Sequence, residues 1–158
     1  MLKYLICEIA NSHNGNANSI FSLLRKIEKI KYRNLGLKFQ VISKNDLAIK
    51  QYKWFNVYQK LYFNEHIWQK IIGTCYNKFD VWLDIFDVYG SKILKQNFNK
   101  IYGIKLQSSV LDNQELLNDL KQINLKKKKV IINVAGYEYF EIKNILKRFS
   151  SIFKNIPI

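Results

Sequence analysis

Two lysines interrupt otherwise apolar runs of the sequence. Lys38 lies within the run 35–41, and Lys105 lies within the run 101–106. A lysine in the middle of a buried strand is unfavourable unless its ammonium group meets an anion or a carboxylate. Two such residues on separate strands therefore predict a place where negative charge is held inside the fold.

Two acidic residues occur in the same setting. Glu8 and Asp84 each lie within a short apolar run of their own. Together with Lys38 and Lys105 they would form a mixed-charge pocket suited to a small, multiply anionic substrate such as a phosphorylated acid. The alternative is a set of internal ion pairs, for example Lys38 with Glu8, that serves packing only. Periodicity alone favours neither interpretation.

The charged residues recur within a repeated pattern of short apolar runs and longer amphipathic segments. This alternation is typical of βα units and predicts an α/β fold with a parallel sheet. Ligands bind at the C-terminal ends of parallel strands, so the charged residues are expected to share one site. The expected strands are 4–10, 35–41, 79–86, 101–106 and 129–135, and the clearest helices are 18–31, 64–76 and 138–149.

Local signals refine several segments. The apolar stripe of the first helix extends to Ile30, which predicts that the helix reaches residue 31. Asp112 with Glu115 three residues later has the form of a capping box and predicts a helix start. The aromatic segment 51–63 is predicted to be a loop packed over a barrel mouth, although aromatics interleaved with lysines also occur in nucleic-acid binding. Residues 152–158 resemble the approach to a sixth strand.

Composition bounds the class of protein. The 158 residues are 48% hydrophobic, which excludes a disordered chain. The net charge of +14 would favour a polyanion partner, but only three of the 26 basic residues are arginines, the type that reads nucleic acids best. Lysine, asparagine and isoleucine abound as they do in AT-rich coding sequences, so a nucleic acid is the less favoured partner. The lysine run 126–129 is predicted to be a solvated edge.

The remaining reactive side chains give weaker signals. Cys7 and Cys75 are too few and too far apart for a disulfide framework, so both are predicted to be buried thiols of a reducing compartment. His13 is predicted to cap or hydrogen-bond a loop. Glu8 interrupts the apolar N-terminus and no run of 18 apolar residues occurs, which predicts a cytoplasmic protein without membrane contact.

Several of these segments together match a known pattern. The sequence CEIANSHNG at 7–15 resembles the opening AEIGxNHxG motif of the sialic acid synthase family, which includes N-acetylneuraminate, legionaminate and pseudaminate synthases. GLKFQ at 36–40 resembles its second-strand VKFQ, and KLQS at 105–108 resembles its fourth-strand KIxS. Asp87 falls at the aspartate that closes its third-strand motif. The order and spacing of the motifs agree over nearly the whole chain.

The resemblance implies a TIM (β/α)8 barrel that condenses phosphoenolpyruvate with an N-acetylated hexosamine to form a nonulosonic acid. A complete barrel takes about 250 residues, or about 31 for each unit, so 158 residues correspond to about five units. We therefore expect residues 1–158 to form a single partial barrel domain. The family's later strands and its C-terminal antifreeze-like domain have no counterpart in this sequence.

The resemblance also implies roles for particular residues. Lys38 and Lys105 would bind the phosphate and carboxylate of phosphoenolpyruvate, and Glu8 would be the acid/base or water-orienting carboxylate. The implied substrate-binding residues are Gln40, Asp84 and Ser108.

Two departures bear on activity. Asp84 places a carboxylate where the family's third-strand STPFD motif has a hydroxyl, and Ser109 and Val110 replace the Gly-Glu that follows its fourth-strand serine. The family uses a divalent metal, Mn²⁺ or Mg²⁺, whose histidine ligands lie on later strands. The chain alone is thus expected to be an inactive fragment. The alternatives are a half barrel that self-associates or meets a complementing C-terminal half, and a non-catalytic binder of anions or nucleic acid.

Overall fold

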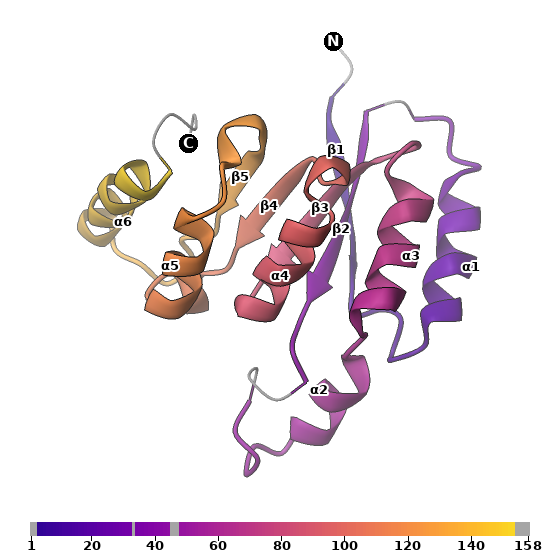
Figure 1. The fold of residues 1–158 in the computed structure, drawn as a ribbon, viewed down its shortest axis with the longest axis horizontal. Helices are drawn as coiled ribbons and strands as arrows, with labels where there is room; N and C mark the ends of the chain where they lie inside the picture. The colour runs from indigo at the N-terminus through magenta and orange to yellow at the C-terminus, as the bar shows by residue number, and fades with distance from the viewer. Residues whose placement is uncertain (1–2, 33, 45–47, 154–158) are drawn as a thin grey trace.

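The architecture is one five-stranded parallel sheet with helices between successive strands (Figure 1). The computed structural model describes residues 3–32, 34–44 and 48–153. The strands are β1 (Leu5–Ala10), β2 (Leu35–Val41), β3 (Asp80–Ile85), β4 (Gly103–Leu106) and β5 (Lys129–Ile132). The α-helices are α1 (Ala17–Ile27), α2 (Phe55–Leu61), α3 (Glu65–Cys75), α4 (Val88–Gln96), α5 (Gln114–Lys121) and α6 (Tyr139–Ile152). Three 3₁₀ turns are η1 (Phe98–Lys100), η2 (Ser108–Val110) and η3 (Leu125–Lys127).

The strands pair in the order in which they occur in the chain, from β1 to β5. Every pair is parallel, so all C-terminal strand ends meet at one edge of the sheet. This confirms the predicted α/β class and the five βα units. Within the described part of the chain, β1 and β5 each pair with one strand only, so the sheet is open at both edges.

One face of the sheet packs against helices. Leu37, Phe39 and Leu83 point to this face and are completely buried. The ring of Phe39 meets the edge of Trp68 from α3, with centroids 6.3 Å apart. Such side chains each contribute about 1.5–3 kcal/mol when buried, so the sheet is held to its helices mainly by this apolar layer.

The opposite face carries the alternate strand positions, and we call it the inner face because it would line a closed barrel. Its N-terminal end holds an aromatic layer made of Tyr4, Trp82 and Tyr102. The Trp82 indole N–H donates to the Tyr4 hydroxyl at 2.8 Å. A Cβ atom at Gly103 would lie 2.5 Å from the Trp82 ring, and one at Gly36 would lie 2.7 Å from its Nε1. Glycine on both neighbouring strands therefore makes room for the indole.

The first helix is shorter than predicted. α1 ends at Ile27, and Ile30 is 55% exposed instead of completing the apolar stripe. After the helix, the N–H groups of Lys29 and Ile30 bond three residues back, to Lys26 and Ile27. This tighter turn rotates Ile30 away from the core.

The predicted capping box at Asp112 is wrong. α5 begins two residues later, where the Asn113 side chain accepts a hydrogen bond from the Leu116 N–H at 3.1 Å. Asp112 instead forms an ion pair with Arg148 of α6 at 2.8 Å. A tertiary partner thus takes the carboxylate that the local pattern assigned to the helix start.

Segment 51–63 is not the predicted loop, because it contains helix α2. Leu61 and Phe63 are buried at its C-terminal side, whereas Tyr52 and Trp54 are 43% and 50% exposed. Only one end of the segment therefore packs on the body. The predicted sixth strand falls on the end of α6 and on residues 154–158, which lie outside the described residues.

The lysine run 126–129 leads into β5 from the N-terminal side of the sheet, as predicted, but it is only partly solvated. Lys128 is half-buried and donates to the carbonyls of Phe98 and Ile101 at 2.6 and 2.5 Å. Burial lowers the pKa of this lysine. In the described part of the chain, no helix is long and apolar enough to span a membrane.

Candidate functional site

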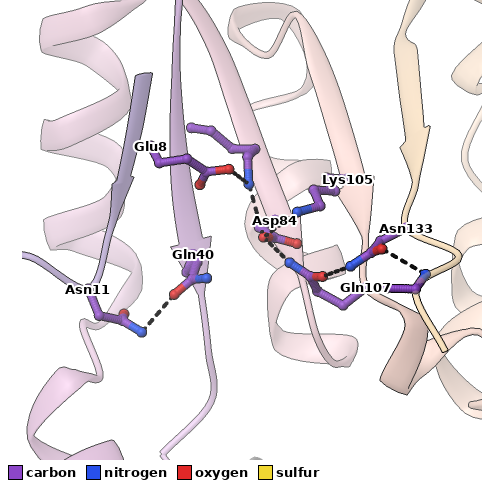
Figure 2. Close-up of polar contacts among 9 residues, drawn as sticks. Glu8, Asn11, Gln40, Asp84, Lys105, Gln107 and Asn133 are labelled. Carbon is purple, nitrogen blue, oxygen red and sulfur yellow. Dashed lines mark hydrogen bonds and ion pairs between the residues drawn. The ribbon is translucent and has the colours of Figure 1, made fainter. Parts of the chain in front are cut away.

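The four charged residues singled out from the sequence come together on the inner face. We call Glu8, Lys38, Asp84 and Lys105 the ion-pair row. Figure 2 labels Glu8, Asp84 and Lys105 of this row. The Lys38 ammonium lies 2.6 Å from Glu8 Oε1 and 3.1 Å from Asp84 Oδ2. The Lys105 ammonium lies 3.9 Å from the same Asp84 oxygen. Acid and base alternate along the row, and both lysines converge on one carboxylate oxygen.

Strand register produces this arrangement. Glu8 of β1 is directly opposite Lys38 of β2, and Asp84 of β3 is directly opposite Lys105 of β4. Lys38 itself pairs with Trp82, two residues before Asp84, so its long side chain reaches toward the C-terminal strand ends. All these positions share one parity and therefore one face of the sheet.

Burial falls from the centre of the row to its ends. Asp84 is completely buried and Lys38 is 3% exposed, whereas Lys105 is 19% and Glu8 52% exposed. A buried charge is tolerated when it is paired and hydrogen-bonded, as both central groups are. Two ammonium and two carboxylate groups give the row a formal charge of zero. The internal ion pairs that one interpretation of the sequence predicted are therefore present. They engage the same four side chains that the other interpretation assigned to an anionic substrate.

Amide side chains extend the row across β4 and β5. Gln107 donates to Asp84 Oδ2 at 2.7 Å, and Asn133 donates to the Gln107 carbonyl at 2.7 Å (Figure 2). Asn133 is held in turn by the Ala135 N–H at 3.0 Å. Sequence reasoning did not assign a role to Gln107, although it directly follows the fourth strand and could have been found from that position.

Gln40 lies beside the row and bonds to the first strand instead. Its carbonyl accepts from the Asn11 amide at 2.7 Å. A bulge between Glu8 and Ala10 shifts the register of β1 by one residue, which brings Asn11 opposite Gln40. Ala10 has a φ of +45° in the same turn, so strained backbone delivers this amide to the site.

Ser108 is placed differently from the other predicted site residues. It begins η2, and its backbone carbonyl accepts from the Tyr137 hydroxyl at 3.2 Å. Among the described residues, no hydrogen bond joins the Ser108 hydroxyl to the ion-pair row. Asp87 has a positioning role, since it accepts from the N–H groups of Ser43 and Gly90 at 2.8 and 2.9 Å. That carboxylate ties the end of β2 to the start of α4.

His13 hydrogen-bonds its loop, as predicted. Its Nδ1 accepts from the Gly15 N–H at 3.0 Å, and its ring packs on Phe63 with centroids 4.4 Å apart. The side chain is 1% exposed, and burial lowers its pKa. Gly15 has a φ of +77°, and a Cβ there would lie 2.2 Å from the Lys60 carbonyl oxygen. The loop after β1 is thus pressed against α2.

The family resemblance implies a divalent metal whose histidine ligands lie on later strands, and the described residues form no metal site by themselves. Among them, no group of three or more histidine, cysteine, aspartate or glutamate side chains could hold an ion. Glu8 and Asp84 are both engaged by Lys38. Cys75 is buried, which raises the pKa of its thiol to about 12, while Cys7 is only half-buried, so its predicted burial is wrong. Both cysteines are free thiols.

Five consecutive parallel βα units with polar groups at the strand C-termini place the protein in the α/β class, and their pairing in chain order is the strand order of part of a TIM barrel. Solved structures share this fold. N-acetylneuraminic acid (sialic acid) synthetase from Leptospira borgpetersenii serovar Hardjo-bovis, determined in complex with citrate, aligns with a TM-score of 0.77 and 20% identity. The alignment covers 96% of this chain and 50% of that protein.

A second structure gives the same result. Spore coat polysaccharide biosynthesis protein SpsE from Bacillus subtilis aligns with a TM-score of 0.67 and 17% identity, covering 96% of this chain and 40% of that protein. The chain thus spans half or less of the length of both proteins. At these identities the likeness establishes the fold, and it confirms the resemblance to the N-terminal part of a sialic acid synthase-like barrel at that level. No family model and no curated protein matches the sequence.

Proposed function

We propose that the inner face is the phosphoenolpyruvate-binding part of a sialic acid synthase-like site. One observation carries the proposal: the ammonium groups of Lys38 on β2 and Lys105 on β4, the strands on either side of β3, converge on one oxygen of Asp84 near the strand C-termini. Two fixed cations at the ligand-binding end of a barrel sheet suit a small molecule that carries a carboxylate and a phosphate. The shared fold with a sialic acid synthetase supports this substrate class.

The proposed reaction joins phosphoenolpyruvate to an N-acetylhexosamine. The enol carbon attacks the sugar aldehyde to form a C–C bond, water adds to the carbon that bore the phosphate ester, and inorganic phosphate leaves. Lys38 and Lys105 would hold the anionic groups. Glu8, which is 52% exposed, is the carboxylate of the row that can reach solvent and accept a proton from water.

Gln40 and Ser108 would lie along the rim of this pocket rather than at its charged centre. Gln40 is held by Asn11, and Ser108 sits at the first turn after β4. Gln40 lies near the end of β2 and Ser108 lies just after β4, so each is close to the C-terminal end of a lysine-bearing strand. A bound amino-sugar would extend over them.

No step of the proposal runs through a metal, because the described residues do not form a site for Mn²⁺ or Mg²⁺. For the 158-residue chain tested by itself we expect binding of phosphoenolpyruvate without turnover. A coupled phosphate-release assay with phosphoenolpyruvate, an N-acetylhexosamine and Mn²⁺ checks the second half of this expectation. Sustained phosphate release that depends on the sugar would contradict it.

Isothermal titration calorimetry with phosphoenolpyruvate tests the binding step. Lys105→Met should weaken binding about tenfold, or about 1.4 kcal/mol, because one of two fixed charges is lost. Lys105 is partly exposed, so the variant should fold. The matched control is Lys92→Met, which removes an exposed lysine of α4. Equal affinity for the wild type and both variants would show that the inner face is not the binding site.

Light scattering on the same samples gives the molar mass. The open edges at β1 and β5 would suit a second copy or a complementing set of strands, since unpaired strand edges recruit partners. A dimer that turns over substrate would favour a self-associated half barrel. Binding of generic DNA that survives Lys105→Met would instead favour the non-catalytic alternative.

A further inference from the structure

Asp84 occupies the point at which the two site lysines converge. We propose that this carboxylate is a resident anion that takes the place of a ligand anion and so limits which anions the subsite can bind. The inference rests on the proposed function, because it concerns the same pair of lysines. It assigns Asp84 a specificity-determining role, in which it competes with substrate.

The contacts of Asp84 are those a bound anion would receive. Its Oδ2 atom accepts from Lys38 at 3.1 Å and from Gln107 at 2.7 Å, and it lies 3.9 Å from the Lys105 ammonium. Two cations and an amide N–H around one oxygen form a typical carboxylate or phosphate subsite. Here the protein supplies the oxygen itself.

The other oxygen of Asp84 argues for the same role. The side chain is completely buried, yet its Oδ1 has no hydrogen-bond partner among the described residues. A buried carboxylate placed only for stability normally has both oxygens satisfied. The unsatisfied oxygen is a hydrogen-bond acceptor, so it would repel another acceptor such as a phosphate oxygen. A ligand group with an N–H or O–H could instead donate to it.

Charge balance gives the expected selectivity. Two ammonium and two carboxylate groups leave the ion-pair row with no net charge, so the wild-type subsite attracts a dianion less strongly than the two lysines would without Asp84. Replacing Asp84 by a neutral residue of the same shape changes the formal net charge of the ion-pair row to +1. Lys38 keeps a partner in such a variant, because Glu8 lies 2.6 Å from its ammonium group. The lysines should therefore remain in place.

The experiment measures the affinity of inorganic phosphate and of phosphoenolpyruvate by calorimetry. Asp84→Asn should bind both at least tenfold more tightly than the wild type. The matched control is Asp119→Asn, which removes one negative charge from an ion pair with Lys95 at the surface between α4 and α5. The control should leave affinity unchanged. Adding Lys105→Met to Asp84→Asn should abolish the gain.

A second variant guards against loss of folding. Gln107→Lys leaves Asp84 in place and sets a new cation next to its carboxylate, at a half-buried position. It should raise phosphate affinity in the same direction as Asp84→Asn. Circular dichroism establishes which variants are folded before affinities are compared.

The outcomes separate this inference from the proposed function. Wild-type binding that Asp84→Asn leaves equal or weakens would overturn the inference, making Asp84 a positioning residue for the lysines, and would leave the proposed function standing. No binding by the wild type with clear binding by Asp84→Asn would support the inference and contradict the proposed function for the natural sequence. No binding by any folded variant would contradict both.

Discussion

The two ends of the inner face differ in chemistry although the same strands build them. On β3, Trp82 belongs to the aromatic layer, and Asp84, two residues later, is the centre of the ion-pair row. On β4, Gly103 makes room for the indole, and Lys105, two residues later, approaches Asp84. Two residues along each strand therefore separate the closed aromatic end of the inner face from its charged end.

The difference shows how stability and function share one surface. The aromatic layer joins its rings directly, and the one indole N–H is satisfied by Tyr4 at 2.8 Å. The ion-pair row can still accept hydrogen bonds, since Asp84 Oδ1 lacks a partner among the described residues and the Glu8 carboxylate is half exposed. In parallel barrels the N-terminal end serves stability and the C-terminal end serves chemistry. Substitutions at the two ends should therefore have different effects.

The largest effect is expected at the aromatic end. Trp82→Ala should lower the free energy of unfolding by about 3–5 kcal/mol, because it empties a buried space that two glycines keep open. Urea denaturation followed by circular dichroism measures this change. Lys105→Met, at the charged end, should lower it by less than about 1 kcal/mol, since Asp84 retains Lys38 and Gln107. Similar losses for both variants would remove the contrast between the ends.

A smaller effect at the same end tests the glycines. Gly103→Ala should cost about 1–3 kcal/mol, because its Cβ would lie 2.5 Å from the Trp82 ring. Gly73→Ala is the control, since a Cβ at this position of α3 meets nothing within 4 Å and should be neutral or stabilising. In the background of Trp82→Ala, the loss at Gly103 should largely disappear. A full loss in that background would mean that the glycine serves the backbone and not the indole.

Much of the fold could be predicted because it depends on alternation within each strand. The run 35–41 matches β2 residue for residue, and the strands that carry Glu8, Asp84 and Lys105 were also found. Lysines within apolar runs marked the site, since a buried ammonium needs a negative partner. The meeting of Glu8 and Lys38 then follows from parallel register.

What could not be predicted depends on tertiary contacts. Asp112 carries a capping signal, yet Arg148 from a distant helix takes its carboxylate. Gln107 reaches Asp84 only because of the turn after β4, and Asn11 reaches Gln40 only because of a bulge at residue 9. Neither a turn nor a bulge leaves a trace in hydrophobic periodicity.

The smallest expected effect concerns pH, and it arises at the charged end. His13, in the loop after β1, is buried, and this burial lowers its pKa below the usual value of about 6.5. Between the two pKa values the unfolded chain binds more protons than the folded one, so the free energy of unfolding falls as pH drops below about 6.5. The decline stops below the pKa of the folded state. Urea denaturation at intervals from pH 7.5 to pH 5, on a scale of about 1.4 kcal/mol for each pH unit at most, measures the slope.

His13→Asn isolates this contribution. The asparagine carbonyl can accept from the Gly15 N–H in place of Nδ1, so the loop bond is kept while the titrating group is lost. The profile should become flatter over this range, and His66→Gln, which removes an exposed histidine of α3, should leave it unchanged. If the slope persists in His13→Asn, the pH response belongs to other groups. His13 would then bind protons equally in the folded and unfolded states, which would contradict a pKa lowered by burial.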